Sequence, residues 1–488
     1  MSLQDNATNE RFKDNHLEPS GKLPLILQFG LIAGPFMTML DTSVVTIALP
    51  EMAKSFSVAL SGLQWVLSAY LLTLGTFLVV SPYLSKRFGA IRIYSVSVLG
   101  FTVASFLCAV SPSLGTLIAA RVFQGAFGAL LTPLAMDILF GKGKSSEKIS
   151  PLIGMVLFMA PALGPTAGGL LIQIFGWPSI FFINVPVGLL SAFVMHKHRS
   201  MNFIIAEETR RFDIPGIIMF GLGIFLLLFA SSEGPLLGWT STFVVSLVLM
   251  GLALILIYYL ISLRRPFPAV NFKILKDHGN ALALAISSLA GVVLFSVIFL
   301  LPVYIESVKG LSALSVGLIL LPQGFVMGLT TGISNKWASG TRGKPMVIIG
   351  MSLLTLSTIP LVIISSNASL WIFAAILCGR GIALGLVIQP LLYQIIGKLG
   401  EADVPDGNAL FNVMERIGGA FGISILASIF ETSETHNMFS LHSNVLIAGT
   451  TAFHETMLIL VLVSLGGFIL SLSIRKDRVL QRSMKQIR

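Results

Sequence analysis

Long apolar stretches separated by short polar segments run along the whole chain. A window of about 19 residues finds fourteen stretches that suit a hydrocarbon layer of about 30 Å. Backbone groups in lipid must pair within their own segment, so these stretches predict helices, and the roughly ten-residue alternating strands of a membrane barrel are absent. The predicted spans are Leu25–Ile47, Leu63–Leu84, Ile93–Val110, Leu114–Leu134, Leu152–Phe175, Ile180–Met195, Ile214–Ala230, Phe243–Leu263, Asn280–Val303, Ser315–Ile333, Pro345–Ile364, Leu370–Ile388, Ala409–Phe430 and Met457–Ile474.

Two longer polar segments enclose one pair of spans and leave six spans on each side. The segments Arg121–Leu134 and Cys378–Leu391 match at an offset of 257 residues, although their arginines are two positions out of register. Such an echo suggests an internal repeat. We therefore predict an all-α membrane protein of two pseudo-symmetric six-helix bundles, an inserted two-helix hairpin and a substrate path between the bundles. The expected boundaries are 1–24 (cytoplasmic tail), 25–197 (first bundle), 198–213 (loop), 214–263 (hairpin), 264–279 (loop), 280–474 (second bundle) and 475–488 (basic tail).

Composition and charge agree with a chain dissolved in lipid. Hydrophobic residues make up 55% of the chain and charged residues 11%, whereas a soluble domain has about a quarter of its residues charged. The net charge of +10 could indicate a nucleic-acid partner, but 27 of the 32 Lys and Arg fall in alternate polar segments. This asymmetry places both termini in the cytoplasm, so we expect a multi-pass protein of the cell membrane and no nucleic-acid partner.

Motifs for other chemistry are missing from the sequence. No GxxxxGK[ST] loop is present to bind a nucleotide, and His454-Glu455 lacks the second histidine of an HExxH zinc site. The two cysteines, Cys108 and Cys378, each lie within an apolar span, so no disulfide framework or CxxC metal site is expected. We therefore predict no catalytic residue, no metal, no cofactor and no enzymatic activity.

Charges inside the spans are the sharpest functional signal, because each costs about 3 kcal/mol at the bilayer centre. Asp41 lies about six residues before the outer end of the first span, and Arg121 about six residues after the outer start of the fourth. Both therefore lie about 9 Å below the outer surface, which permits an ion pair. One interpretation is structural: each side chain snorkels to water or locks two helices together. The other is a protonatable carboxylate whose pairing with Arg121 is switched by protons or substrate.

The fourth span carries polar and small residues on one face. Gln124, Gly125 and Thr132 follow Arg121 at i+3, i+4 and i+11. Small residues let helices approach closely and polar ones need a protein or water environment, so this face should point inward. A packing seam alone would explain the glycine but not Arg121. We assign Gln124, Gly125 and Thr132 to a substrate cavity.

Two further spans carry clusters of small residues. In the fifth, Gly164, Pro165, Gly168 and Gly169 predict a kinked hinge or a seal. In the thirteenth, Glu415 and Arg416 precede another glycine pair. Adjacent residues point about 100° apart on a helix, so both cannot face one cavity.

We place Glu415 in the substrate cavity and Arg416 at a cytoplasmic gate, with a ligand role for Arg416 as the alternative. Asp137, Glu233 and Glu306 lie near span ends, where ordinary interfacial carboxylates are expected.

Several motifs resemble the major facilitator superfamily, and more narrowly its fourteen-span drug:proton antiporter branch, which exports quaternary ammonium compounds and dyes. They are LDTSVVTIALP in the first span, RVFQG in the fourth, GPTAGG in the fifth, GWPSIFFINVPVG after it, LPVYIESVKGLSALSVGLILLP and NALFNVMERIGGAFGISIL. The resemblance implies alternating access, with export coupled to proton entry. It also implies that Asp41 is the acidic first-span residue, Arg121 the proton-coupling arginine and Gly164–Gly169 the antiporter signature.

The loop after the second span is similar to the family's gating motif GxLADRxGR but departs from it. In PYLSKRFGAIR, Pro82 replaces the usual glycine and Lys86 the usual aspartate, while Arg87 and Gly89 are retained. We assign Arg87 and Gly89 to the cytoplasmic gate. The loss of the carboxylate argues against a salt-bridge gate at this loop.

These observations predict a proton-driven exporter of amphipathic, cationic or aromatic compounds. Its partners would be the small-molecule substrate, protons and the lipid bilayer, with a periplasmic adaptor if the source cell has two membranes. The first alternative is an exporter of one metabolite or siderophore. The second is an uptake symporter, against which the resemblance of GPTAGG to the antiporter signature argues. A membrane-embedded enzyme or sensor would need a catalytic motif or a soluble domain, and neither is found.

Overall fold

The computed structural model describes residues 24–58, 60–140, 164, 167–198, 213–266, 268–311, 313–338, 343–397, 399–400, 403–440 and 444–474. All regular elements within these residues are helices. Thirteen of them are long and apolar enough to cross a membrane. The predicted fifth span lies mostly outside the described residues, although 167–175 are helical. The prediction of an all-α membrane protein is confirmed.

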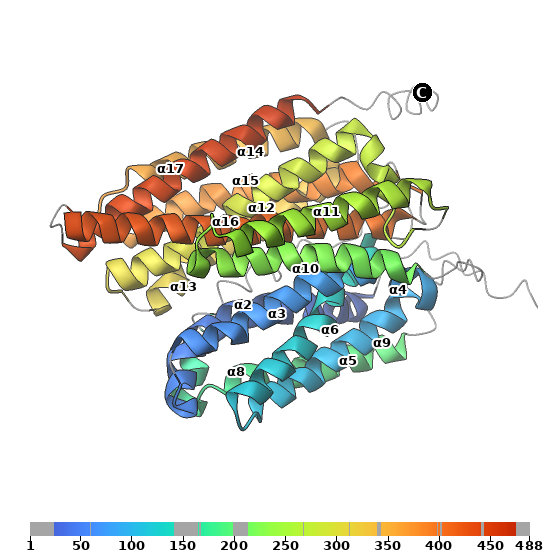
Figure 1. Ribbon diagram of the computed structural model, residues 1–488, viewed down its shortest axis with the longest axis horizontal. Helices are drawn as coiled ribbons and strands as arrows, with labels where there is room; N and C mark the ends of the chain where they lie inside the picture. Colours follow the sequence, from blue (N-terminus) through green and yellow to red (C-terminus); the bar gives the residue numbers. More distant parts are fainter. Residues whose placement is uncertain are drawn as a thin grey trace, which may run out of the picture.

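The first half of the chain forms one group of helices, drawn from blue to blue-green in Figure 1. Its elements are α2 (Leu25–Phe56), α3 (Leu60–Phe77), η1 (Leu78–Val80), α4 (Ser81–Phe88), α5 (Ala90–Ala109), α6 (Leu114–Phe140), α8 (Ser179–Phe182) and α9 (Asn184–Lys197). Helix α6 packs against α2, α3 and α5, and α9 packs against α2 and α5. Gly89, with φ +85°, turns the chain from α4 directly into α5, a conformation that side chains with a Cβ disfavour.

The second half forms a matching group, drawn from yellow to red in Figure 1. Its elements are η4 (Phe272–Lys276), α12 (His278–Val303), η5 (Tyr304–Val308), α13 (Ala313–Ala338), α14 (Gly343–Val362), α15 (Leu370–Ile396), α16 (Val404–Ser440) and α17 (Val445–Leu472). Helix α15 packs against α12, α13 and α14, as α6 does against α2, α3 and α5. Asp277, Ser369 and Asn444 cap α12, α15 and α17 by accepting hydrogen bonds from backbone N–H groups.

The sequence echo between the fourth and twelfth spans has a structural counterpart. A Cβ at Gly125 of α6 would lie 2.6 Å from the Tyr70 carbonyl oxygen of α3, and one at Gly381 of α15 would lie 2.5 Å from the Gln323 carbonyl oxygen of α13. The matched helices therefore use glycine for the same close approach to a neighbouring backbone. Arg121 and Arg380 are both fully buried.

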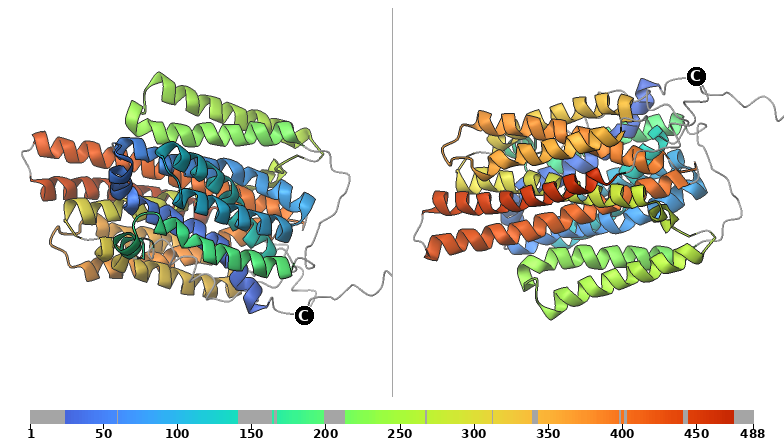
Figure 2. Two further views of the ribbon diagram at one scale, coloured as in Figure 1. Left: turned by 90° about the horizontal axis from the view of Figure 1, so that it is seen from below. Right: turned by 90° about the horizontal axis from the view of Figure 1, so that it is seen from above.

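The inserted hairpin consists of α10 (Ile214–Leu237) and α11 (Thr242–Arg264). Figure 2 shows this green pair alongside the two halves. Helix α10 packs against α3 of the first half and α16 of the second. The hydroxyls of Ser232 and Ser68 are 3.2 Å apart, and Trp239 Nε1 donates to Ser428 Oγ at 3.1 Å. The hairpin thus contacts both halves.

Several helices extend beyond the predicted spans. Helix α2 ends at Phe56, nine residues after the predicted end at Ile47, and α16 has 37 residues where 22 were predicted. A hydropathy window detects only the apolar part of a helix, so polar turns at the ends are missed. Asp41 therefore lies deeper within its helix than the sequence suggested.

Candidate functional site

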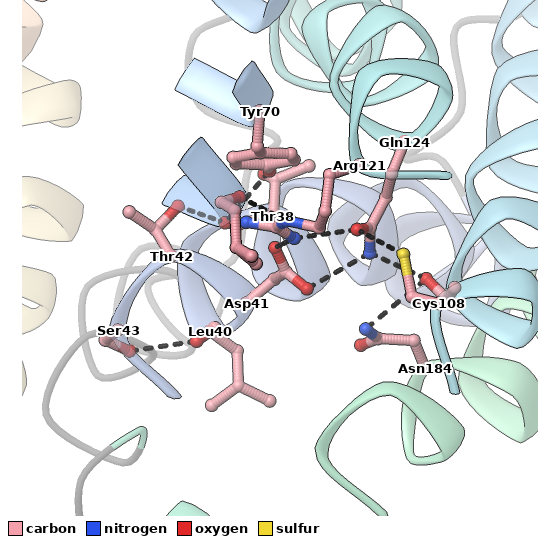
Figure 3. Close-up of polar contacts among 12 residues, drawn as sticks. Thr38, Leu40, Asp41, Thr42, Ser43, Tyr70, Cys108, Arg121, Gln124 and Asn184 are labelled. Carbon is pink, nitrogen blue, oxygen red and sulfur yellow. Dashed lines mark hydrogen bonds and ion pairs between the residues drawn. The ribbon is translucent and has the colours of Figure 1, made fainter. Parts of the chain in front are cut away.

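Asp41 of α2 and Arg121 of α6 form an ion pair inside the first half. Arg121 Nη1 donates to Asp41 Oδ2, and the two side chains are 0% and 1% exposed for the arginine and the aspartate. Figure 3 shows the carboxylate and the guanidinium directed toward one another. The ion pair that the sequence permitted is therefore present. Because neither side chain reaches water, snorkelling does not explain their presence.

The guanidinium of Arg121 is also held by groups other than Asp41. Its Nε donates to the Val66 carbonyl oxygen at 3.0 Å, and Nη1 donates to Gln124 Oε1 at 2.7 Å. Its Cζ lies 4.0 Å from the centre of the Tyr70 ring, within range of a cation–π interaction. The Nη2 atom has no hydrogen-bond partner. The structure thus fixes the arginine but leaves one of its donors unused.

Gln124 joins the two members of the pair to a third helix. Its Nε2 donates to Asp41 Oδ1 at 3.0 Å and to Ser105 Oγ of α5 at 2.9 Å. Its Oε1 accepts from Arg121 and from Cys108 Sγ, the latter at 3.5 Å. Asn184 of α9 donates to Ser105 at 3.5 Å. A continuous polar network therefore crosses the first half from α2 to α9 (Figure 3).

The groups bonded to the Asp41 carboxyl all donate hydrogen bonds to it. The ionised carboxylate is stabilised by one buried arginine and one amide, both donors. Protonation would remove the attraction to Arg121 and leave a guanidinium with fewer partners in a medium of low dielectric. The stability of the pair therefore depends on the charge of both partners.

The glycines of the predicted hinge lie against the helix that carries Asp41. A Cβ at Gly164 would lie 1.9 Å from Ser43 Oγ, and one at Gly168 would lie 2.8 Å from Val44 Cγ1. A Cβ at Gly169 would meet nothing within 4 Å, and Pro165 lies outside the described residues. Gly164 and Gly168 thus pack closely against α2, at positions two and three residues after Asp41.

The remaining residues assigned to a substrate cavity are not gathered at one place. Gln124 and Gly125 are buried, Gln124 within the ion-pair network and Gly125 against α3. Thr132 is half-buried two turns further along α6. Glu415 of α16 is also half-buried and makes no ion pair among the described residues, while Arg416 Cζ lies 5.5 Å from the centre of the Phe295 ring.

At the end that the sequence predicts to be cytoplasmic, the two halves are joined by an ion pair. Lys86 Nζ of α4 lies 2.6 Å from Asp406 Oδ2 of α16. The expectation that this loop lacks a salt bridge is therefore wrong: Lys86 stands where the family has aspartate, and the carboxylate is supplied from the opposite half. Arg87 is exposed and Gly89 forms the turn beside it. Arg416 lies twelve residues, or about 18 Å, along α16 from its start, so the structure does not place it with them.

Asp137, at the same end, also differs from its prediction. It is 7% exposed rather than interfacial, because Asn408 of α16 covers it and donates from Nδ2 to its Oδ1. Asp406 and Asn408 were missed because they precede the apolar part of the thirteenth span. Tyr70 and Ser105 were missed because single polar residues within apolar spans are common. Only their contacts with Arg121 and Gln124 identify them.

Comparison with known proteins identifies the family. The Major Facilitator Superfamily matches residues 31–203 and 204–423. The riboflavin transporter RibZ of Clostridioides difficile is 28% identical over 418 residues, covering 84% of this chain and 89% of RibZ. Multidrug resistance protein Stp of Mycobacterium tuberculosis is 26% identical over 402 residues, covering 81% and 74%.

A solved structure has the same fold. The human organic anion transporter MFSD10 (TETRAN) superposes with a TM-score of 0.59 at 14% identity, covering 92% of this chain and 98% of that one. Its arrangement agrees with the two groups of helices described above. The family match covers nearly all of the first group, the hairpin and the second group as far as residue 423. The chain therefore belongs to the major facilitator superfamily of membrane transporters.

Proposed function

We propose that this transporter exports amphipathic, cationic or aromatic compounds from the cytoplasm in exchange for protons. It would lie in the cell membrane with both termini in the cytoplasm, as the distribution of Lys and Arg favours. The multidrug resistance protein Stp, similar over four fifths of the chain, supports a drug as substrate.

The observation that carries the proposal is the sealed ion pair of Asp41 and Arg121. Ionisable residues buried in a membrane are costly, and here both are held by hydrogen bonds from several helices. Opening to the outside would let a proton reach Asp41, and separation of the neutral acid from Arg121 would favour the inward-open state. The glycine seam of Gly164 and Gly168 lets α2 lie close enough to transmit this movement.

Glu415 supports the cationic nature of the substrate. Its carboxylate is half-buried in the middle of α16, and its chain neighbour Arg416 is turned over the Phe295 ring. Glu415 forms no ion pair within the described part of the chain. A positively charged compound entering between the halves would supply the missing charge.

Inside-out vesicles with an imposed proton gradient test this function. We expect gradient-dependent uptake of ethidium by the wild type and its loss in Asp41→Asn, because the amide cannot exchange a proton. Glu51→Gln, near the outer end of the same helix, is the matched control and should retain uptake. If Asp41→Asn transports as the wild type does, Asp41 is structural and the coupling site lies elsewhere, with Glu415 the next candidate.

A narrower substrate is the alternative that one relative favours. RibZ is named a riboflavin transporter and is similar over most of its length. The same vesicles should be assayed with riboflavin and with several organic cations. Transport of riboflavin alone would replace the multidrug proposal with an exporter or importer of one metabolite, while transport of the cations alone would exclude it.

A further inference from the structure

Asp137 and Asn408 form a buried contact between the two halves at the cytoplasmic end. Asp137 belongs to α6 and Asn408 to α16, and they are 7% and 0% exposed. Asn408 Nδ2 donates to Asp137 Oδ1. The contact lies beside the ion pair of Lys86 and Asp406, which joins the same two halves. Any opening of this end must break both contacts.

Two acceptor atoms of this contact lack a hydrogen-bond donor. Asp137 Oδ2 and Asn408 Oδ1 are both buried and both lack a partner. In the ionised state both atoms are acceptors, so neither can satisfy the other. A proton on Asp137 Oδ2 converts that atom into a donor. Asn408 Oδ1 belongs to the amide already bonded to the same carboxyl, so the protonated acid and the amide can form two hydrogen bonds at once.

The charges around Asp137 favour the same protonation. The charged groups that face its carboxyl are Lys86 of α4 and Asp406 of α16, and the Ser85 hydroxyl lies near it. Lys86 already pairs with Asp406 at 2.6 Å. An ionised Asp137 would therefore be a second negative charge beside a single positive one, buried from water. A neutral Asp137 leaves one positive and one negative charge in the cluster.

We propose that Asp137 is a proton-binding site of the closed cytoplasmic end. One proton binds to Asp137 Oδ2 as α6 and α16 come together, and the same proton leaves to cytoplasmic water when they separate. This site is distinct from Asp41, and it requires neither a role for Asp41 nor a particular substrate. Because the closed state holds one more proton than the open state, a rise in cytoplasmic pH favours opening, by at most about tenfold per pH unit.

Distance measurements between spin labels test the site directly. Lys197→Cys at the end of α9 and Ser473→Cys after α17 place exposed labels at the cytoplasmic ends of the two halves. Cys378 is replaced by serine, and Cys108, which is buried within the Asp41 network, is kept. Double electron–electron resonance in lipid nanodiscs, between about pH 6 and pH 8, then gives the ratio of open to closed molecules.

We expect the open population of the wild type to rise with pH. Asp137→Asn, which pairs with Asn408 as a neutral amide, should stay closed at every pH. Asp403→Asn is the matched control: it keeps the acceptor that Asn271 Nδ2 donates to at 3.1 Å, and its response should equal that of the wild type. An unchanged pH response in Asp137→Asn, or none in the wild type, would overturn the proposal.

An infrared measurement keeps the proposal testable if Asp137→Asn does not fold. The difference spectrum between low and high pH should contain the C=O stretching band of a buried protonated carboxylic acid. Asn408→Ala removes the amide that bonds this acid, so the band should move to the higher frequency of a free carboxylic acid. A band that does not respond to Asn408→Ala would belong to another carboxylate and contradict the site.

Discussion

Gln124 shows at the residue scale how one neutral side chain can organise a buried pair of charges. It donates to Asp41 and to Ser105, and it accepts from Arg121 and Cys108, so its whole hydrogen-bonding capacity is used. An amide supplies a donor for the carboxylate and an acceptor for the guanidinium without adding charge. Glutamate could not replace it, because a second carboxylate would repel Asp41.

Gln124→Leu should therefore destabilise the protein, although it conserves volume. The substitution leaves Asp41 Oδ1 and other buried atoms without partners, at a cost of about 1–3 kcal/mol each in the free energy of unfolding. Thermal unfolding in detergent should show a lowered Tm. Gln394→Leu, which loses one 3.3 Å bond to the Gly279 carbonyl oxygen, is the control and should have the smaller effect. Equal shifts would mean that the network contributes little.

At the scale of elements, seams of small residues set how closely the helices pack. Gly164 and Gly168 lie against α2, and Gly418 and Gly422 lie against α12, the corresponding helix of the second half. A Cβ at Gly418 would lie 2.3 Å from the Ser288 carbonyl oxygen. Without a hydrophobic driving force between helices in lipid, such close packing provides much of their association. The seam beside Asp41 therefore also fixes the position of the carboxylate.

Gly164→Ala should impair transport more than Gly169→Ala. At position 164 the new methyl group would overlap Ser43, whereas at position 169 it meets open space. Displacement of α2 near Asp41 would weaken the ion pair and, by overpacking, cost about 1–3 kcal/mol. Initial rates of ethidium uptake in inside-out vesicles compare the two variants at matched expression. Equal rates would show that α2 can move aside at no functional cost.

The sequence could predict those residues that differ clearly from their neighbours along the chain. Asp41 and Arg121 are conspicuous because charges are rare within apolar spans, and the hydropathy pattern alone indicates the spans. The ion pair of Lys86 and Asp406 could not be predicted in the same way. Lys86 reverses the usual charge of the motif, so the sequence does not indicate that it forms an ion pair. Its partner Asp406 lies 320 residues away in a polar segment. Only the packing of α16 against α4 brings them together.

At the scale of the whole molecule, the two halves meet through polar contacts between α4, α6 and the start of α16. Lys86 is the partner nearer to water: its side chain is 14% exposed, whereas that of Asp406 is 1% exposed. The flexible lysine stem can carry its ammonium into water when the halves separate, whereas the buried aspartate depends on the lysine for as long as they are closed. The two partners of this bridge are therefore not equivalent.

This asymmetry predicts unequal effects of removing either partner. Lys86→Met leaves a buried carboxylate unpaired, which should destabilise the closed state by about 3–5 kcal/mol. Asp406→Asn frees a lysine that can reach water, so about 1 kcal/mol is expected. The labels at positions 197 and 473 report the open population of each variant, and Lys276→Met, at an exposed cytoplasmic lysine, is the control. Lys86→Asp combined with Asp406→Lys restores opposite charges and should recover part of the closed population. No recovery would mean that the surrounding groups, among them Asp137, accept a lysine on α4 but not on α16.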